Sequence, residues 1–217
     1  RRQRQMCIRD SYCTDIKRDP HGAFWCSTRQ GLYKIQGNRV ERADPTLLPG
    51  LPSETVRFSL PLSDGSILVC MDLKDLYLCR PEKGQALRLN EDFPELNRSR
   101  AMSFAIEIKP GQLIIGGQNG LFGYEIARKK LQRLAWIVPW ERYSTKYNCA
   151  YAEGTSVWIG TQNGLICHDF RTKETLRLST ENGLPNNCIQ GIAADAEGKL
   201  WLSLIHISEP TRPEPIS

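Results

Sequence analysis

Short apolar runs alternate with polar turns through most of the chain, and the alternation repeats about every 44 residues. A triplet led by glycine or aspartate marks each copy: Gly31-Leu32-Tyr33, Asp75-Leu76-Tyr77, Gly120-Leu121-Phe122 and Gly164-Leu165-Ile166. A large apolar residue stands six positions before the start of each triplet: Trp25, Val69, Ile114 and Trp158. A fifth copy begins at Leu200 and Trp201. A period of this length with several short apolar runs indicates a repeat protein whose units stack on one another.

The last complete copy predicts how one unit is built. Residues 157–161, 165–170 and 174–179 are short runs rich in strand-forming residues. Asn163 and Gly164 supply the positive φ angles that a tight hairpin between the first two runs needs. Together with a run that precedes them, these segments predict four strands joined by polar turns, which is the make-up of one β-propeller blade.

We therefore predict an all-β chain that is a β-propeller fragment, with about four four-stranded blades and part of a fifth. The blades are expected at residues 12–44, 53–91, 98–135, 144–180 and, in part, 186–201. A closed propeller has about 4–8 blades, and each blade buries its faces against its neighbours. We expect this fragment to be an open arc that exposes blade faces and tends to aggregate.

Both ends of the chain break the repeat. Residues 1–11 and 202–217 resemble the two translated arms of a transposase-type sequencing adapter. In the codons of that adapter, the stretch for residues 6–10 is the reverse complement of the stretch from residue 202 into residue 207, and natural termini have no reason to show this. We therefore expect residues 1–11 and 202–217 to be adapter-derived, and residues 12–201 to be native and a fragment at both ends.

The formal net charge of the chain is +5, and this basic character comes mainly from the N-terminal end. Four of the first nine residues are arginine, so the native part is only weakly basic and does not predict a nucleic-acid partner. No apolar run approaches the roughly 20 residues that a membrane-spanning helix needs. We therefore expect no membrane contact by this fragment.

Seven of the eight cysteines lie within the repeats, and no Cys-x-x-Cys spacing occurs. Cys26 and Cys70 align with Ile115 and Ile159 of other copies. We interpret such cysteines as small buried apolar residues. A disulfide framework or a metal site is the alternative.

The last linker and strand form a longer motif. It reads Asn182-Gly183-Leu184-Pro185-Asn186-Asn187 and continues through Asp195 and Gly198 to Leu200-Trp201. This motif resembles the repeat of two-component regulator propellers, and the resemblance covers essentially all of residues 12–201. In that family the propellers form the extracytoplasmic sensor of hybrid two-component histidine kinases, which sense breakdown products of complex carbohydrates and control the matching utilisation genes.

The resemblance implies a fragment of a periplasmic sensor, with the parent receptor anchored in the inner membrane. The expected partners are an oligosaccharide or similar small ligand and a second copy of the parent receptor, and no cofactor is expected. We do not expect this fragment to be an enzyme, although its parent would carry a histidine kinase. The alternatives are a propeller-fold enzyme, such as a polysaccharide lyase or a quinone-dependent dehydrogenase, and a non-catalytic interaction scaffold.

The repeats contain no predicted catalytic or metal-binding residues. Asp19, Asp64 and Asp195 all fall in the turn between the first two strands of their blades, where turn chemistry explains them. The histidines of the native part, His21 and His168, have no spacing that suits zinc. We interpret the recurring tryptophans, Trp25, Trp158 and Trp201, as core packing.

One segment, residues 136–147, departs from the repeat and is dense in aromatic and cationic residues. It replaces the Gly-Leu-Pro linker between two blades, and loops between blades gather on the faces of a propeller, where function is usually placed. Aromatic faces with Arg and Lys donors suit a sugar, through stacking and charge-assisted hydrogen bonds. We predict Trp140, Arg142, Tyr143 and Lys146 as ligand contacts. The alternative is that the tryptophans of this segment fill the gap between two blades.

Overall fold

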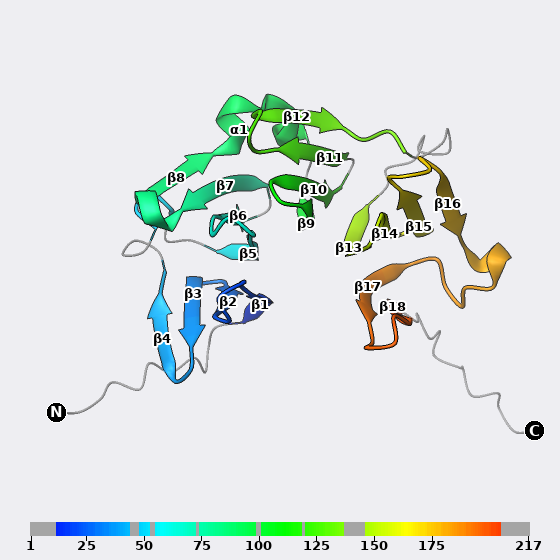
Figure 1. Cartoon of the computed structure of the whole chain (residues 1–217), viewed down its shortest axis with the longest axis horizontal. Coiled ribbons are helices and arrows are strands. Elements are labelled where there is room, and N and C mark those ends of the chain that lie inside the picture. The colour runs from blue at the N-terminus through cyan, green and yellow to red at the C-terminus, as the bar shows by residue number, and fades with distance from the viewer. Residues whose placement is uncertain are drawn as a thin grey trace, which may run out of the picture. The chain divides into compact units, whose positions relative to one another are not determined.

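The computed structural model describes residues 12–43, 48–52, 55–72, 74–98, 101–118, 120–136 and 146–204. Within them the chain forms four four-stranded sheets and a fifth sheet of two strands (Figure 1). Neighbouring strands in each sheet are consecutive in the sequence, so every sheet is an antiparallel meander, as in a propeller blade. The predicted all-β propeller fragment, with about four blades and part of a fifth, is confirmed.

The chain divides into two compact units, one ending at Tyr147 and one beginning at Asn148, and the first unit contains three blades. The first blade comprises β1 (Cys13–Arg18), β2 (Phe24–Thr28), β3 (Gly31–Gln36) and β4 (Arg39–Arg42). The second comprises β5 (Val56–Pro61), β6 (Ile67–Met71), β7 (Asp75–Arg80) and β8 (Gln85–Arg88), with the short helical turns α1 (Leu89–Asp92) and η3 (Pro94–Arg98) after it. The third comprises β9 (Met102–Lys109), β10 (Gln112–Gly117), β11 (Gly120–Glu125) and β12 (Lys130–Arg133).

The second unit contains the fourth blade and the described part of a fifth. The fourth blade comprises β13 (Tyr147–Glu153), whose first residue is at the boundary, β14 (Ser156–Thr161), β15 (Gly164–Asp169) and β16 (Thr175–Leu178). The fifth sheet comprises β17 (Ile189–Ala194) and β18 (Leu200–Leu204). Residues 202–204 of the adapter-like tail pair with β17. Strand pairing uses the backbone and the alternation of side chains, whatever the origin of the codons, so the adapter interpretation stays a prediction.

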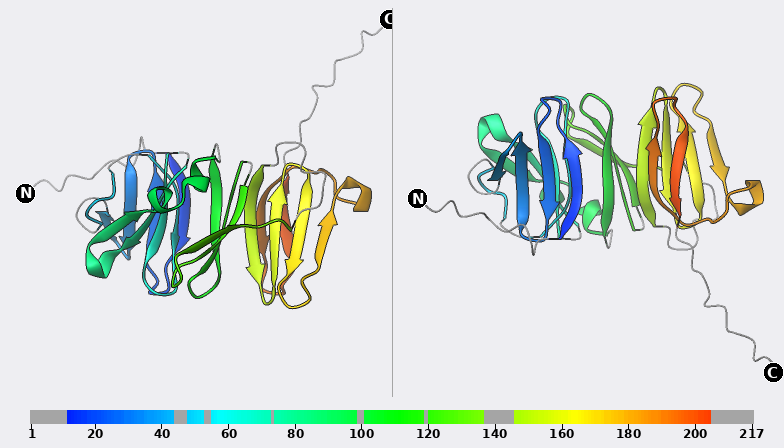
Figure 2. Two further views of the ribbon diagram at one scale, coloured as in Figure 1. Left: turned by 90° about the horizontal axis from the view of Figure 1, so that it is seen from above. Right: turned by 90° about the horizontal axis from the view of Figure 1, so that it is seen from below.

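Two apolar clusters lie between the blades of the first unit, whose sheets follow one another side by side in Figure 2. The first cluster joins the first two blades and includes Trp25, Leu32, Val56, Val69 and Cys79. The second joins the second and third blades and includes Leu68, Leu76, Met102, Ile115 and Phe122. The second blade therefore buries one set of side chains toward the first blade and the other set toward the third, as the alternation of a strand requires.

The pairing register corrects the predicted column of large apolar residues. Trp25, Ile114 and Trp158 each lie opposite the residue three positions after the start of the triplet. In the second blade the residue equivalent to Trp25 is Leu68, which pairs with Leu78. Val69 is not the equivalent residue. The turn from β6 to β7 contains one more residue than the corresponding turns, so a constant spacing of six picks the wrong face of the strand. The same shift makes Cys70 equivalent to Ser27 rather than to Cys26.

The aspartate turn of the first blade is confirmed as turn chemistry and also holds the tryptophan of β2. Asp19 Oδ1 accepts hydrogen bonds from the backbone N–H groups of His21 and Ala23, each at 2.9 Å. Asp19 Oδ2 accepts from the indole Nε1 of Trp25 at 3.0 Å. Partial burial opposes ionisation of Asp19, but the hydrogen bonds from Trp25, Ala23 and His21 outweigh it and lower its pKa. The carboxylate thereby joins the turn to a buried residue of the next strand.

The fifth sheet repeats this arrangement. Asp195 Oδ1 accepts from the backbone of Glu197 and Lys199, and Asp195 Oδ2 accepts from Trp201 Nε1 at 2.9 Å. The indole hydrogen bond is the main cause of the lowered pKa of Asp195. Trp25 is 4% exposed and Trp201 is 59% exposed. Core packing therefore describes Trp25 but is wrong for Trp201 in this structure.

Candidate functional site

The predicted ligand contacts fall mainly outside the described residues. Trp140, Arg142 and Tyr143 lie there, and Lys146 is described. Lys146 forms an isolated antiparallel bridge with Gln118, which lies in the turn between β10 and β11. The predicted segment therefore ends beside the turn between the second and third strands of the third blade. Below, the turn end of a blade means the end that carries the turn between its second and third strands.

An arginine occupies the same register position on the fourth strand, here called the outer strand, of every four-stranded sheet. It lies opposite the third residue of the triplet in each case: Arg42 opposite Tyr33, Arg88 opposite Tyr77, Arg133 opposite Phe122 and Arg177 opposite Ile166. The four arginines recur at nearly the spacing of the repeat, but the sequence analysis concentrated on apolar and turn residues and missed them. Their recurrence at nearly the repeat spacing is the sequence signal that could have revealed them.

Two of these arginines bind the backbone of the turn directly. Arg42 Nη2 donates to the carbonyl oxygen of Gln30 at 2.7 Å. Arg177 donates from Nε and Nη2 to the carbonyl oxygen of Asn163, at 3.1 and 2.5 Å. Gln30 and Asn163 both stand just before the glycine that starts the triplet. The guanidinium group therefore holds the turn end of the blade in place from the outer strand, with charge-assisted hydrogen bonds.

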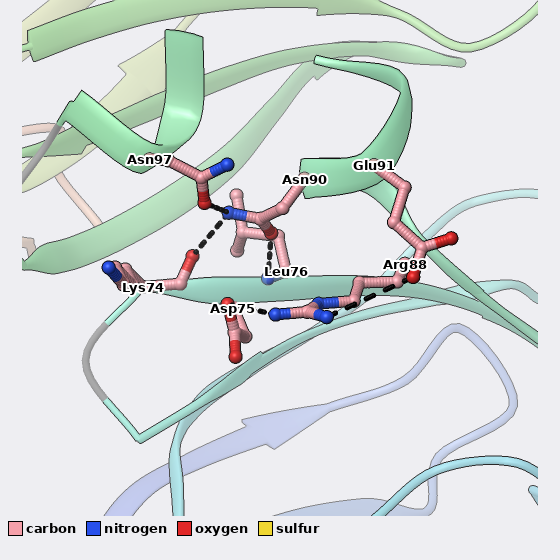
Figure 3. A network of polar contacts seen from close by, with 7 residues as sticks. All are labelled: Lys74, Asp75, Leu76, Arg88, Asn90, Glu91 and Asn97. Atoms are coloured by element: carbon pink, nitrogen blue, oxygen red, sulfur yellow. Dashed lines mark hydrogen bonds and ion pairs between the residues drawn. The ribbon is translucent and has the colours of Figure 1, made fainter. Parts of the chain in front are cut away.

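The second blade uses the same arginine differently because its turn is longer (Figure 3). Asp75 stands in place of the glycine, and Arg88 Nη2 lies 3.1 Å from Asp75 Oδ1. Arg88 Nη1 also lies 3.9 Å from Glu91 Oε1. The hydrogen bond that Arg88 donates to the carboxylate of Asp75 is the main cause of the raised pKa of Arg88. Arg88 thus forms an ion pair between the last two strands of its blade, where Arg42 and Arg177 bind a carbonyl oxygen.

A buried asparagine ties the loop after β8 to the same turn end (Figure 3). Asn90 is 4% exposed, and its Oδ1 accepts from the backbone N–H of Leu76 at 2.8 Å. Its Nδ2 donates to the carbonyl oxygen of Lys74 at 3.2 Å and to Asn97 Oδ1 at 3.0 Å. These bonds satisfy the buried amide and place the loop between two blades against the turn. The turn end is therefore a braced surface that can support a binding loop.

Arg177→Lys is expected to destabilise the second unit by about 1 kcal/mol, because one ammonium group cannot reproduce two guanidinium donors on one carbonyl oxygen. The measurement is the urea midpoint followed by far-ultraviolet circular dichroism. Arg171→Lys is the matched control, since Arg171 is exposed in the turn after β15. Equal midpoints for the two variants would contradict the bracing role.

The opposite end of the first unit carries an open pocket of about 530 Å³. It is lined by Arg18, Asp19, Pro20, Gly22, Pro61, Ser63 and Glu107. Its two carboxylates already serve turns: Asp19 as described above, and Glu107 through bonds from Ser63 N and Oγ, at 2.8 and 2.9 Å, and from Gly111 N at 2.8 Å. Carboxylates bound in this way stabilise loops and are poorly suited to moving protons.

His168 occupies a strand position in the fourth blade. It is 7% exposed, its Nδ1 lies 2.8 Å from Thr175 Oγ1, and its ring meets Phe170 edge to face at 5.2 Å. Burial lowers its pKa. Among the residues that the structure describes, no group of three or more His, Cys, Asp and Glu side chains could hold a metal ion. In the same part of the chain, no helix has the length and apolar character to cross a membrane.

Comparison with known proteins agrees with the repeat motif. Residues 183–205 match the family model of the two component regulator propeller. No curated protein matches the chain. The extracellular domain of the hybrid two component system BT3049 from B. thetaiotaomicron is similar to 88% of this chain, with a TM-score of 0.68 and 18% identity. That of BT4673 from the same organism is similar to 94% of the chain, with a TM-score of 0.68 and 17% identity.

The chain spans only 27% and 29% of those two domains. Another similar structure is the virginiamycin B lyase of Staphylococcus aureus with quinupristin, with a TM-score of 0.62, 12% identity and coverage of 89% of this chain and 63% of the lyase. Similarity at these identities shows the fold, and the motif match bears on one repeat. The chain is therefore a β-propeller fragment that carries a repeat of the two component regulator propeller family.

Proposed function

We propose that this chain is part of the extracytoplasmic sensing propeller of a hybrid two-component receptor whose output is a histidine kinase. The observation that carries the proposal is the match of residues 183–205 to the two component regulator propeller. The similarity to extracellular domains of two hybrid two component systems supports it. The periplasmic location, the anchor in the inner membrane and the kinase belong to the proposal, because the chain spans less than a third of those domains.

The proposed ligand is an oligosaccharide released from a complex carbohydrate. Trp140, Arg142, Tyr143 and Lys146 are the proposed contacts, since aromatic faces stack on sugar rings and cations donate to hydroxyl and carboxylate oxygens. The position of Lys146 beside Gln118 supports a site at the turn end of the third blade. Binding there would bias the arrangement of propellers in a receptor dimer, and a membrane helix would carry that change to the kinase and its carbohydrate-utilisation genes.

A propeller enzyme is the second candidate, favoured by the similarity to a lyase. An enzyme of this fold needs convergent acids, bases or cations that are available to a substrate. The pocket lined by Asp19 and Glu107 uses both of these carboxylates in turn hydrogen bonds. We therefore favour the sensor over the enzyme.

Trp140→Ala is expected to weaken oligosaccharide binding about two- to tenfold, because a stacked aromatic ring contributes roughly 0.5–1.5 kcal/mol of binding free energy. The measurement is isothermal titration of the 217-residue chain with a panel of neutral and acidic oligosaccharides, after circular dichroism has shown that each variant is folded.

Trp201→Ala is the matched control, because Trp201 is an exposed tryptophan held by Asp195 and belongs to no predicted site. It should leave the affinity unchanged. If the folded chain binds an oligosaccharide and Trp140→Ala does not weaken that binding, the proposed contacts are wrong. Turnover of a bound sugar would favour the enzyme.

A further inference from the structure

Two cysteines of the first blade lie in contact. Cys13 is in β1 and Cys26 is in β2, and their Sγ atoms are 3.2 Å apart. A disulfide bond is about 2.05 Å long, so the two sulfur atoms need to approach by only about 1 Å. Cys13 is exposed and Cys26 is half-buried, so a small oxidant can reach the pair.

The strand pairing explains the contact. Cys26 lies opposite Ile16 and Cys13 lies opposite Thr28, so the two cysteines are diagonal neighbours on one face of the sheet. The register shifts between Cys13 and Asp15, and such a bulge bends the strand and re-aims the side chain beside it. The contact therefore depends on the folded sheet and not on the thirteen positions that separate the cysteines in the chain.

The other blades of the first unit place side chains together at the same two positions. The equivalent pairs are Val56 with Val69 in the second blade and Met102 with Ile115 in the third. All four are fully buried, and each pair belongs to a single apolar cluster. Proximity at these positions is thus a property of the repeat, and in the first blade both positions are cysteine.

We propose that Cys13 and Cys26 form a disulfide bond that links β1 to β2 in the first blade. The oxidant is a low-molecular-weight or protein disulfide. The thiolate of Cys13 attacks it, forms a mixed disulfide and releases one thiolate. Cys26 then attacks the Cys13 sulfur of the mixed disulfide, closes the bond and releases the second thiol. Overall, two cysteine thiols are oxidised, one external disulfide is reduced to two thiols, and the hydrogens pass to those thiols.

The geometry alone supports formation of this bond in an oxidising buffer. Its presence in the cell rests in addition on the proposed extracytoplasmic location, because disulfides persist in oxidising compartments. Burial, followed by the contact with Cys13, raises the pKa of Cys26 to about 12. The more exposed Cys13 is therefore the residue that starts the exchange.

The test is oxidation of the 217-residue chain with glutathione disulfide, alkylation of the remaining thiols, and mass spectrometry of a non-reducing tryptic digest. Cleavage after lysine and arginine places Cys13 in the peptide of residues 10–17, Cys26 in residues 19–29 and Cys7 in residues 5–9. We expect the peptides of residues 10–17 and 19–29 to be joined. Separate alkylation of Cys13 and Cys26, or a link from Cys13 to Cys7, would overturn the proposal.

A second measurement separates selective from incidental pairing. In concentrated urea the same oxidation should lose its preference for Cys13 with Cys26, because the pairing depends on the fold. In buffer, reduction should lower the thermal midpoint of the oxidised chain by about 5 °C or more, as expected for a loop of this length. Cys26→Ser should abolish that shift and Cys167→Ser should preserve it. If reduction still lowered the thermal midpoint of Cys26→Ser, the assignment to this pair would be wrong. This outcome does not depend on whether the chain belongs to a receptor.

Discussion

Gly117→Ala is expected to destabilise the first unit by about 3 kcal/mol, at the upper end of the usual cost of overpacking. Gly117 ends β10, where a Cβ atom would collide with the backbone carbonyl oxygen of Ala101 and lie 2.8 Å from Met102 Cα. Both obstacles are backbone atoms, so no side-chain rotation relieves the clash. The collision also strains the hydrogen bond from Gln118 N to Ala101 O, which is 2.7 Å long. Urea unfolding followed by circular dichroism and tryptophan fluorescence measures the loss.

Gly123→Ala is the matched control in the neighbouring strand, β11. The nearest atom to a Cβ at Gly123 is Leu134 Cδ2, at 3.2 Å, which is the end of a flexible side chain. This variant should cost less than about 1 kcal/mol, since a rotamer change absorbs a contact of this kind. If Gly117→Ala and Gly123→Ala gave the same midpoint, the backbone approach at Gly117 would not be the constraint that we infer.

Asp19→Asn is expected to cost about 2 kcal/mol at pH 7, which is typical for a hydrogen bond to a charged group that leaves a buried donor without its acceptor. The substitution can keep an oxygen facing the backbone of His21 and Ala23, but it then turns an NH₂ group toward the indole N–H of Trp25, which is 4% exposed. Two donors then face each other. The measurement is the urea midpoint together with the fluorescence of Trp25.

The sign of the pH dependence follows from the lowered pKa of Asp19. A carboxyl group whose pKa is lower when folded stabilises the protein above its unfolded pKa, here near 3.8, and loses this contribution as the pH falls below that value. The difference between wild type and Asp19→Asn should therefore be full at neutral pH and shrink in acid. A difference that persisted undiminished in acid would show that the charge of Asp19 is not its cause.

Asp195→Asn serves as the control for the environment of the tryptophan. It removes the same indole hydrogen bond, but Trp201 is 59% exposed and can donate to water instead. We expect a clearly smaller loss than for Asp19→Asn. Equal losses would mean that burial of the indole plays no part.

The pattern of short apolar runs and turn residues was sufficient to predict the fold. Alternation along a strand and the turn preferences of Gly, Asn and Asp are local properties, so they can be read from neighbouring residues. The predicted runs at residues 157–161, 165–170 and 174–179 match β14, β15 and β16, and differ from them by one residue at one or both ends. Apolar and polar patterning thus predicted strand identity, and only the turn from β6 to β7 misled the alignment.

The candidate site could be predicted only in part. An unusual aromatic and cationic segment pointed to Trp140, Arg142, Tyr143 and Lys146, and of these only Lys146 lies in the described chain, beside Gln118. The arginines that brace the turn ends were recoverable from their recurrence, but what they bind was not. An arginine on an outer strand can face solvent, an acid or a carbonyl oxygen, and only the folded turn determines which.

By itself the sequence determined that the chain is built of four-stranded blades and which residues make several of its turns, because these follow from local alternation and a constant repeat. Tertiary structure alone decided that Leu68 and not Val69 takes the place of Trp25, that Arg88 pairs with Asp75, and that Cys13 meets Cys26. These outcomes depend on the length of one turn and on a bulge in one strand. Both change which side chains share a face while leaving the pattern along the chain almost unaltered.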